Sequence, residues 1–262
     1  MKTQTQFSAI TFKLTEDTYF VVYRGTDNTL VGWKEDFNMS FVCPVPAQTL
    51  AVEYLEMIAK QFDGKIIVGG HSKGGNLAVY AAAFCDPEIQ ERITMVYNYD
   101  GPGFTENVLA EEGYKRICGR IKTYVPQSSV VGMLLGHEEK YTIVHSSNPT
   151  MLLQHDTYTW DIRRNKFVYL ETVTNSSKFI DSTLKGWMSS LDSARREKVV
   201  DTIYNILLQT KAKTIKDLSK NWLATSNKIV KSLITLDDDT RKIVLEAIGA
   251  LVQCAANELF KK

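Results

Sequence analysis

The chain has 262 residues, of which 44% are hydrophobic and 10% aromatic. That is enough apolar material for a substantial core, so an intrinsically disordered protein is excluded. Lys and Arg number 31 against 30 Asp and Glu, a formal net charge of +1, and without an overall positive field nucleic-acid binding is not expected as the main task.

The first part of the chain predicts a hairpin followed by a helix and a buried strand. Residues 7–14 and 18–24 are β-branched and aromatic runs separated by a short polar segment, which is typical of antiparallel strands. Apolar residues recur at helical spacing over 47–62, and Gly64 ends that predicted helix. The run 65–70 (KIIVGG) is apolar and followed by glycines, which predicts a buried parallel strand.

Strands and helices continue to alternate beyond this point. Residues 75–85 are Ala-rich and apolar on nearly all sides, which predicts a helix packed on the sheet and stopped at Asp86-Pro87. Three further short strands are expected at 92–99, 120–125 and 141–146. A last hairpin is expected from 157–162 and 166–171. This order predicts an α/β fold, a mostly parallel sheet flanked by helices with its functional loops at the carboxyl ends of the strands.

The character of the chain changes near residue 175. No convincing strand follows, and helical periodicity continues to the end of the chain. Helices are expected over 179–191, 194–209, 214–234 and 239–260. The sequence therefore predicts an α/β domain at 1–174 and an α-helical C-terminal extension at 175–262.

One motif carries chemistry. Gly70-His71-Ser72-Lys73-Gly74 fits G-x-S-x-G between a predicted strand and a predicted helix, the context of a nucleophile elbow. Gly70 and Gly74 leave room for neighbouring chain, and the backbone N–H of Lys73 at the helix N-terminus can stabilise an oxyanion. The segment does not fit a phosphate-binding loop, because Lys73 is followed by Gly74. Ser72 is therefore the predicted nucleophile, with a structural turn as the alternative.

Three segments resemble a known family: 21–37 (VVYRGTDNTLVGWKEDF), 69–78 (GGHSKGGNLA) and 154–160 (QHDTYTW). Together they resemble the class 3 lipase branch of the α/β-hydrolases, and more closely an uncharacterised bacterial family of lipase-like proteins. The similarity spans about residues 7–170 and implies an α/β-hydrolase-like fold. In such lipases the residue after Arg-Gly supplies a second oxyanion donor, which implies that role for Thr26. The alternative for Thr26 is a turn residue at a strand end.

A serine nucleophile needs a general base, and the chain has four histidines. His71 adjoins the nucleophile and is expected to point away from it and pack, His137 is expected to be solvated in a polar loop, and His145 is expected to be an ordinary buried or capping residue. His155 follows the last core strand, fits the Ser, acid, His order of this fold and lies in the Gln-His-Asp segment of the resemblance. His155 is therefore the predicted base.

The acid departs from the lipase pattern. Class 3 lipases have an aspartate after the strand equivalent to 120–125, where this chain has no carboxylate. Asp100, after strand 92–99, is the predicted substitute, because related hydrolases carry the acid one strand earlier. A turn role in Asp-Gly-Pro-Gly is an equal alternative. Asp156 is poorly placed beside His155, and a Ser-His dyad oriented by Ser129, the alternative acid position, or by a backbone carbonyl stays open.

The helical tail contains a basic segment. Residues 211–234 hold six lysines and one aspartate, so a predicted amphipathic helix could make weak peripheral contact with an anionic membrane. The alternative is a helix packed on its neighbours with a solvated lysine face. The last predicted helix, 239–260, is expected to be core.

The cellular location of the protein and the state of its cysteines are predicted from patterns that the sequence lacks. The start has no signal-peptide pattern and no window approaches the ~20 apolar residues of a membrane span, which favours a soluble cytoplasmic protein. The four widely spaced cysteines are expected to be buried thiols. Relatives usually carry a segment before the first strand, which implies a short variant or a truncated product.

The predicted function is a serine esterase or lipase-like hydrolase that acts on a small-molecule or lipid acyl ester. Ser72, His155 and Asp100 would form the catalytic triad, Thr26 and Lys73 the oxyanion hole, and no metal or organic cofactor is required. The alternative is a catalytically impaired hydrolase-fold protein that binds partners through its helical tail. The missing lipase aspartate favours this alternative, and the intact serine elbow opposes it.

Overall fold

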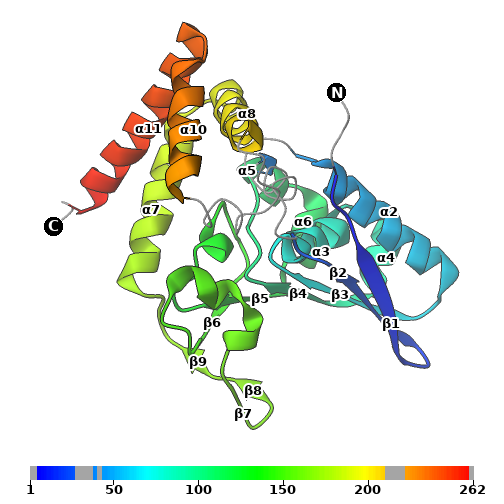
Figure 1. Cartoon of the computed structure of the whole chain (residues 1–262). Helices are drawn as coiled ribbons and strands as arrows, with labels where there is room; N and C mark the ends of the chain where they lie inside the picture. Colours follow the sequence, from blue (N-terminus) through cyan, green and yellow to red (C-terminus); the bar gives the residue numbers. More distant parts are fainter. Residues whose placement is uncertain (1–4, 27–37, 40–42, 210–221, 260–262) are drawn as a thin grey trace. The chain divides into compact units, whose positions relative to one another are not determined.

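The computed structural model describes residues 5–26, 38–39, 43–209 and 222–259 (Figure 1). These residues divide into two compact units. One unit holds 7–25 and 44–181, and the other holds the remaining described residues. The unit boundary lies inside a helix that begins at residue 175, and a division into domains at 174/175 stays a prediction.

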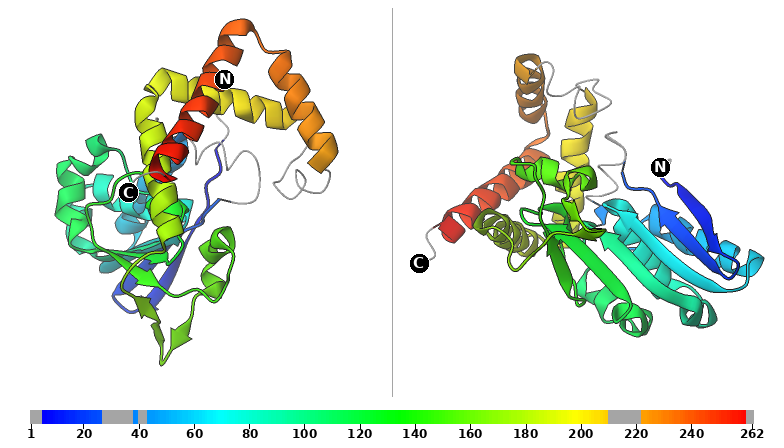
Figure 2. Two further views of the ribbon diagram at one scale, coloured as in Figure 1. Left: turned by 90° about the vertical axis from the view of Figure 1, so that its left-hand side faces the viewer. Right: turned by 90° about the horizontal axis from the view of Figure 1, so that it is seen from below.

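The first unit is built on a seven-stranded sheet with the order β1-β2-β3-β4-β5-β6-β9. Its strands are β1 (Ala9–Thr15), β2 (Thr18–Tyr23), β3 (Lys65–His71), β4 (Ile93–Tyr99), β5 (Ile121–Pro126), β6 (Tyr141–Val144) and β9 (Tyr169–Leu170). Strands β2 to β6 are parallel, whereas β1 and β9 pair antiparallel at the two edges. The strands lie side by side in the right-hand view of Figure 2. The predicted mostly parallel sheet is confirmed, with strand ends shifted by a residue or two.

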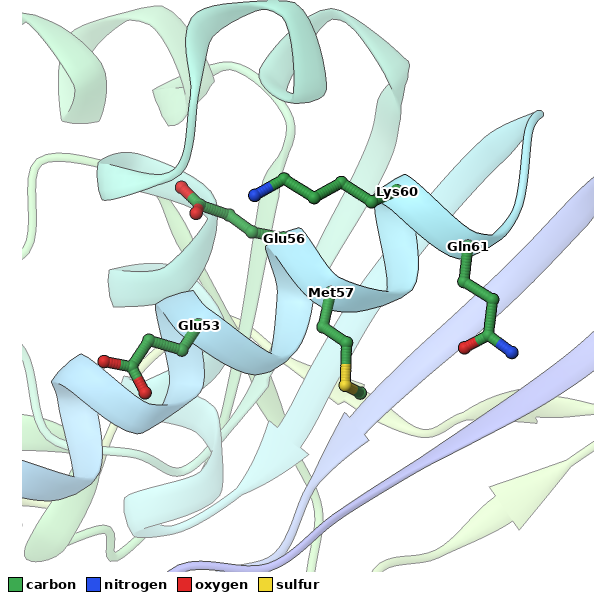
Figure 3. Close-up of a pocket in the computed structure, with 5 residues that line it drawn as sticks. All are labelled: Glu53, Glu56, Met57, Lys60 and Gln61. Carbon is green, nitrogen blue, oxygen red and sulfur yellow. The ribbon is translucent and has the colours of Figure 1, made fainter.

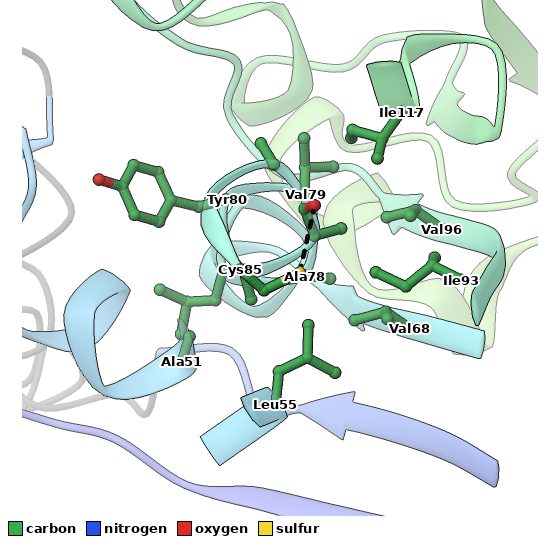
Figure 4. Packing of buried hydrophobic residues seen from close by; sticks show 14 of the residues in the cluster. Ala51, Leu55, Val68, Ala78, Val79, Tyr80, Cys85, Ile93, Val96 and Ile117 are labelled. Carbon is green, nitrogen blue, oxygen red and sulfur yellow. Dashed lines mark hydrogen bonds between the residues drawn. The ribbon is translucent and has the colours of Figure 1, made fainter. Parts of the chain in front are cut away.

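Helices cover one face of this sheet (Figure 1). They are α2 (Pro46–Gln61), α3 (Lys73–Phe84), α4 (Pro87–Arg92), α5 (Glu106–Leu109) and α6 (Glu112–Cys118). Helix α3 lies centrally, against β3 and β4 on one side and α2 and α6 on the other. Its Ala-rich sequence permits this, because short side chains let strands and helices approach closely from every direction. Its neighbours Leu55, Val68 and Ile117 are fully buried (Figure 4).

The sequence missed the short helices α4, α5 and α6. Pro87 does end α3, but it also occupies the first position of α4, where proline is favoured because its missing N–H would have no partner. The Asp86 carboxylate accepts the backbone N–H of Glu88 and caps the new helix. Asp-Pro therefore both stops one helix and starts the next.

The expectation of buried thiols holds for Cys85 but not for Cys43, which is exposed.

The hairpin expected from 157–162 and 166–171 lies around the predicted turn, but it is shorter than predicted, and residues 157–159 are not part of it. Residues 157–159 form a 3₁₀ turn, because the Asp156 carboxylate accepts the N–H of Tyr158 and caps it. The actual hairpin is β7 (Ile162–Arg163) with β8 (Lys166–Phe167), joined by Arg164 and Asn165 at positive φ. Two positive φ values are what a tight two-residue hairpin turn requires.

The C-terminal region is helical, as predicted. Its helices are α7 (Asn175–Ser190), α8 (Ser193–Gln209), α10 (Trp222–Ile234) and α11 (Asp238–Leu259). The helix expected over 214–234 is described only from Trp222 onward, since 210–221 lie outside the described residues. In α11, Val244 and Ala247 are buried, and the indole N–H of Trp187 donates to the Ala247 carbonyl at 2.8 Å. Among the helices described, none combines the length and apolar character needed to cross a lipid bilayer.

Candidate active site

Ser72 stands alone between the end of β3 and the start of α3. Its backbone has φ 58° and ψ −131°, a conformation that costs a non-glycine residue about 1–3 kcal/mol. Backbone hydrogen bonds hold it there: the Ser72 N–H donates to the Tyr99 carbonyl at 2.9 Å, and the Ser72 carbonyl accepts the N–H groups of Gly75 at 2.9 Å and Asn76 at 3.3 Å. The strand, strained serine and helix have the arrangement expected of a nucleophile elbow.

Glycines around Ser72 allow the close approach that the elbow needs. A Cβ at Gly74 would lie 2.2 Å from the Tyr23 carbonyl oxygen, and one at Gly70 would lie 2.4 Å from the Gly74 carbonyl oxygen. A Cβ at Gly25 would lie 2.6 Å from the His71 carbonyl oxygen. The chain leaving β2 therefore runs directly against the elbow, and no side chain larger than hydrogen fits at these positions without displacement of backbone.

The structure supports the two predicted oxyanion donors to different extents. Lys73 is the first residue of α3, so its backbone N–H lies among those at the helix N-terminus, where negative charge is favoured. Its side chain is buried. Thr26 directly follows Gly25 and is half-buried, but it belongs to the other compact unit. Its role as a donor stays a prediction.

His155 and Asp100 are brought together. The imidazole Nδ1 of His155 lies 2.7 Å from Oδ2 of Asp100, although 55 positions separate them in the chain. Asp100 follows β4 with φ 51° and is completely buried, whereas the His155 side chain is 27% exposed. Since a carboxylate only accepts, Nδ1 carries the proton, and Nε2 is the ring nitrogen left to act as a base.

The remaining oxygen of Asp100 is held by the segment that follows β5. The Ser129 hydroxyl donates to Oδ1 at 2.5 Å, and the Gly132 N–H donates to the same atom at 3.2 Å. The turn after β4 is stabilised by Asn98, whose Oδ1 accepts the Gly101 N–H at 2.9 Å. Asp100 therefore faces His155 and Ser129 rather than the turn, and Ser129 bonds to the carboxylate of Asp100. No pattern in the sequence indicated the contributions of Asn98 and Gly132.

The other three histidines differ from expectation. His71 lies against His155, with ring centroids 4.5 Å apart and Nε2 2.7 Å from the His155 carbonyl oxygen. Burial first, and then the neighbouring charge of His155, lower the pKa of His71 below its usual value. His137 is not solvated: its side chain is only 9% exposed and pairs with Glu139. His145 is partly exposed and pairs with Asp161 at 2.9 Å.

Glu139 is a buried acid that the sequence did not reveal, because Glu138-Glu139-Lys140 looks like a surface run of charge. It accepts hydrogen bonds from the Tyr114 hydroxyl at 2.6 Å, the Thr123 hydroxyl at 2.5 Å and His137 Nδ1 at 3.0 Å. Burial alone would raise the pKa of Glu139, but the hydrogen bonds and the charge of His137 outweigh it and hold the pKa at about 2. This cluster ties the loop after β5 to the sheet and to α6.

We expect Glu139→Gln to reduce the free energy of unfolding at pH 7 by about 3 kcal/mol, from the pKa displacement of Glu139. A depressed carboxyl pKa stabilises the fold above the ordinary value of 4.5, and this contribution is lost as pH falls toward 2. The difference between wild type and variant should therefore shrink over that range. Urea unfolding at several pH values measures it, with the exposed neighbour Glu138→Gln as control. Equal unfolding free energies at pH 7 for wild type and Glu139→Gln would refute the role of this carboxylate.

A surface depression on α2 lies away from these residues. It has a volume of about 480 Å³ and is lined along one side of α2 by Glu53, Glu56, Met57, Lys60 and Gln61 (Figure 3). Its lining is the charged outer surface of a helix and includes no residue of the Ser72, His155 and Asp100 group. No three His, Cys, Asp or Glu side chains of the described ranges are grouped so that they could hold a metal ion.

Comparison with known proteins gives a family match and two similar structures. Residues 1–205 match the profile of the Mbeg1-like family. The M37 lipase structure is 17% identical, with a TM-score of 0.37 over 48% of this chain and 49% of that lipase. A fungal lipase in complex with an inhibitor is 19% identical, with a TM-score of 0.37 over 54% of this chain and 62% of that lipase. The matched part is thus less than two thirds of either lipase. No curated protein matches the chain.

Proposed function

Because the chain belongs to the Mbeg1-like family, which is lipase-like, we propose that it is a serine hydrolase that cleaves acyl esters through an acyl-enzyme intermediate. The observation that carries the proposal is the His155–Asp100 pair, held at 2.7 Å. This pair lies beside the elbow, since the ring of His155 contacts His71, the residue before Ser72. A strained serine and an imidazole oriented by a carboxylate are the two parts that activation of a hydroxyl nucleophile requires.

In the first half of the reaction, the Ser72 hydroxyl attacks the ester carbonyl carbon while His155 Nε2 takes its proton. Asp100 keeps the other proton on Nδ1 and stabilises the imidazolium that forms. The Lys73 and Thr26 backbone N–H groups hold the oxyanion of the tetrahedral intermediate. The intermediate collapses when the bond to the alcohol oxygen breaks, and His155 returns its proton to that oxygen.

In the second half, a water molecule attacks the acyl-enzyme and gives a proton to His155. Collapse of the second intermediate releases the carboxylic acid and returns the proton to Ser72. This cycle requires neither a metal nor an organic cofactor, because His155 carries each proton and the two proposed backbone donors stabilise the developing negative charge. A small-molecule or lipid acyl ester is the proposed substrate class, and a cytoplasmic location stays a prediction.

Covalent labelling with a fluorophosphonate probe tests the proposal. Such a probe captures only an activated serine, so we expect the wild-type protein to be labelled at Ser72 and heat-unfolded protein to remain unlabelled. Peptide mapping locates the modified residue. Absence of labelling in the folded protein would reject the hydrolase and favour the alternative, a hydrolase-fold protein that binds partners through its helices.

A weak contact with anionic membranes is proposed for segment 211–234. In its described part, α10 exposes Lys228 and Lys231 together with the apolar Val230 and Ile234. Each exposed lysine near an anionic surface contributes about 1 kcal/mol. We expect the protein to co-sediment with phosphatidylserine vesicles, less at high salt and less with neutral vesicles, and we expect Lys228→Gln with Lys231→Gln to weaken the binding. Equal, negligible sedimentation with both vesicles would identify the lysines as solvated surface.

A further inference from the structure

We propose that His71 is a positioning residue that fixes the general base relative to the nucleophile. This inference rests on the proposed hydrolase function and deepens it. His71 belongs to the elbow itself, as the residue directly before Ser72, and it contacts His155 both through the ring and through the backbone. The elbow therefore holds the base as well as the nucleophile.

The hydrogen bond defines what His71 contributes. Its Nε2 lies 2.7 Å from the His155 carbonyl oxygen, and a carbonyl only accepts, so His71 must carry a proton on Nε2. The ring planes are inclined by 39° with centroids 4.5 Å apart. One side chain thus restrains the backbone of His155 and lies against its imidazole.

The loop that carries His155 has a second anchor on its other side. The Gln154 side chain accepts the Ser128 N–H at 3.0 Å and donates to the Asn148 carbonyl at 2.7 Å. The indole N–H of Trp160 donates to the Gln154 carbonyl at 2.8 Å. These bonds hold the loop to itself and to the segment after β5. His71 adds a direct bond between the loop and the elbow.

Charge gives His71 a second effect. The titratable groups that face it are His155, Asp100 and Asp156. Burial and the charge of His155 lower the pKa of His71, which favours its neutral form, so the imidazolium of His155 forms without a second positive charge on His71. At lower pH, a charge on His71 would oppose the charge on His155. Two ionisations should then contribute to the loss of activity in acid.

The test compares three variants by steady-state hydrolysis of a short-chain p-nitrophenyl ester over a range of pH. His71→Phe keeps an aromatic ring but loses the donor, and His71→Gln keeps a donor but does not titrate. His145→Gln is the matched control, since it makes the same substitution at a histidine whose ring pairs with Asp161 and not with His155. Thermal unfolding shows whether each variant folds.

We expect His71→Phe to lower kcat about 10- to 100-fold with little change in KM, because a small misplacement of a catalytic group costs about that much. His71→Gln should recover part of the loss and change the acid limb of kcat/KM from steeper than one proton to a single ionisation. His145→Gln should behave as wild type.

Two outcomes would overturn the inference, and they are distinguishable. If fluorophosphonate labels Ser72 in the wild type but a folded His71→Phe keeps the wild-type kcat, or His71→Gln keeps the wild-type acid limb, His71 does not have the proposed role and the hydrolase function stands. If the wild type itself is not labelled, the hydrolase function fails and the role of His71 fails with it. If His71→Phe does not fold, the acid limb of kcat/KM in His71→Gln decides, because a limb as steep as that of the wild type would contradict the proposed role of His71.

Discussion

Replacement of Ser72 with alanine is expected to abolish ester hydrolysis by this protein, with a loss of about 10⁶-fold in kcat as found when other serine hydrolases lose their nucleophile. The fold should survive, because alanine and serine face the same strain at φ 58° and the backbone bonds to Tyr99 and Gly75 do not involve the side chain. Hydrolysis of short-chain p-nitrophenyl esters measures the effect. His155→Ala should have a similar consequence, since the hydroxyl then has no base.

The control for Ser72→Ala is Ser147→Ala, which removes an exposed hydroxyl from the same compact unit. It should hydrolyse the ester at the wild-type rate. Thermal unfolding of both variants separates loss of chemistry from loss of structure. Unchanged hydrolysis by a folded Ser72→Ala protein would reject Ser72 as the nucleophile and leave the partner-binding alternative as the better account of the elbow.

The second large effect is expected at the acid. Asp100→Asn should lower kcat about 10⁴-fold, because an amide no longer fixes the tautomer of His155 or balances its charge. Stability should change little, since the asparagine oxygen can still accept the hydrogen bonds of Ser129 and Gly132. The measurement is the same ester assay, accompanied by thermal unfolding. An active Asp100→Asn enzyme would show that Asp100 is not the acid.

Ser129→Asp is the counterpart to that experiment, because position 129 follows the strand after which class 3 lipases keep their acid. In this chain the Ser129 hydroxyl lies 2.5 Å from Asp100 Oδ1, so a second carboxylate there would be buried against the first. Two buried carboxylates in contact cannot both ionise without a large cost. We expect Ser129→Asp to lose both stability and activity. A gain in activity would instead place the acid at position 129.

The elbow could be read from the sequence because everything that makes it is local. An apolar strand, five residues with glycines at fixed positions and an Ala-rich helix follow one another directly, and they form β3, the Ser72 turn and α3. The parallel strands could also be predicted from the sequence, since buried strands are short apolar runs. The structure of residues 157–162 could not be predicted in this way, because the Asp156 carboxylate caps a 3₁₀ turn in a segment with strand-like composition.

The order of strands and helices and the position of Ser72 between β3 and α3 could therefore be derived from the sequence, and His155 stays its predicted base, chosen by chain order and resemblance. The surroundings of these residues could be seen only in the folded structure. Asp100 and Ser129 follow neighbouring parallel strands whose carboxyl ends meet at one edge of the sheet, and the direction of each side chain made one a partner of His155 and the other a donor to Asp100. The contact of His71 with His155, 84 positions away in the chain, likewise could be seen only in the folded structure. Contacts between distant residues depend on strand register and side-chain direction, and these are fixed by packing rather than by any local pattern.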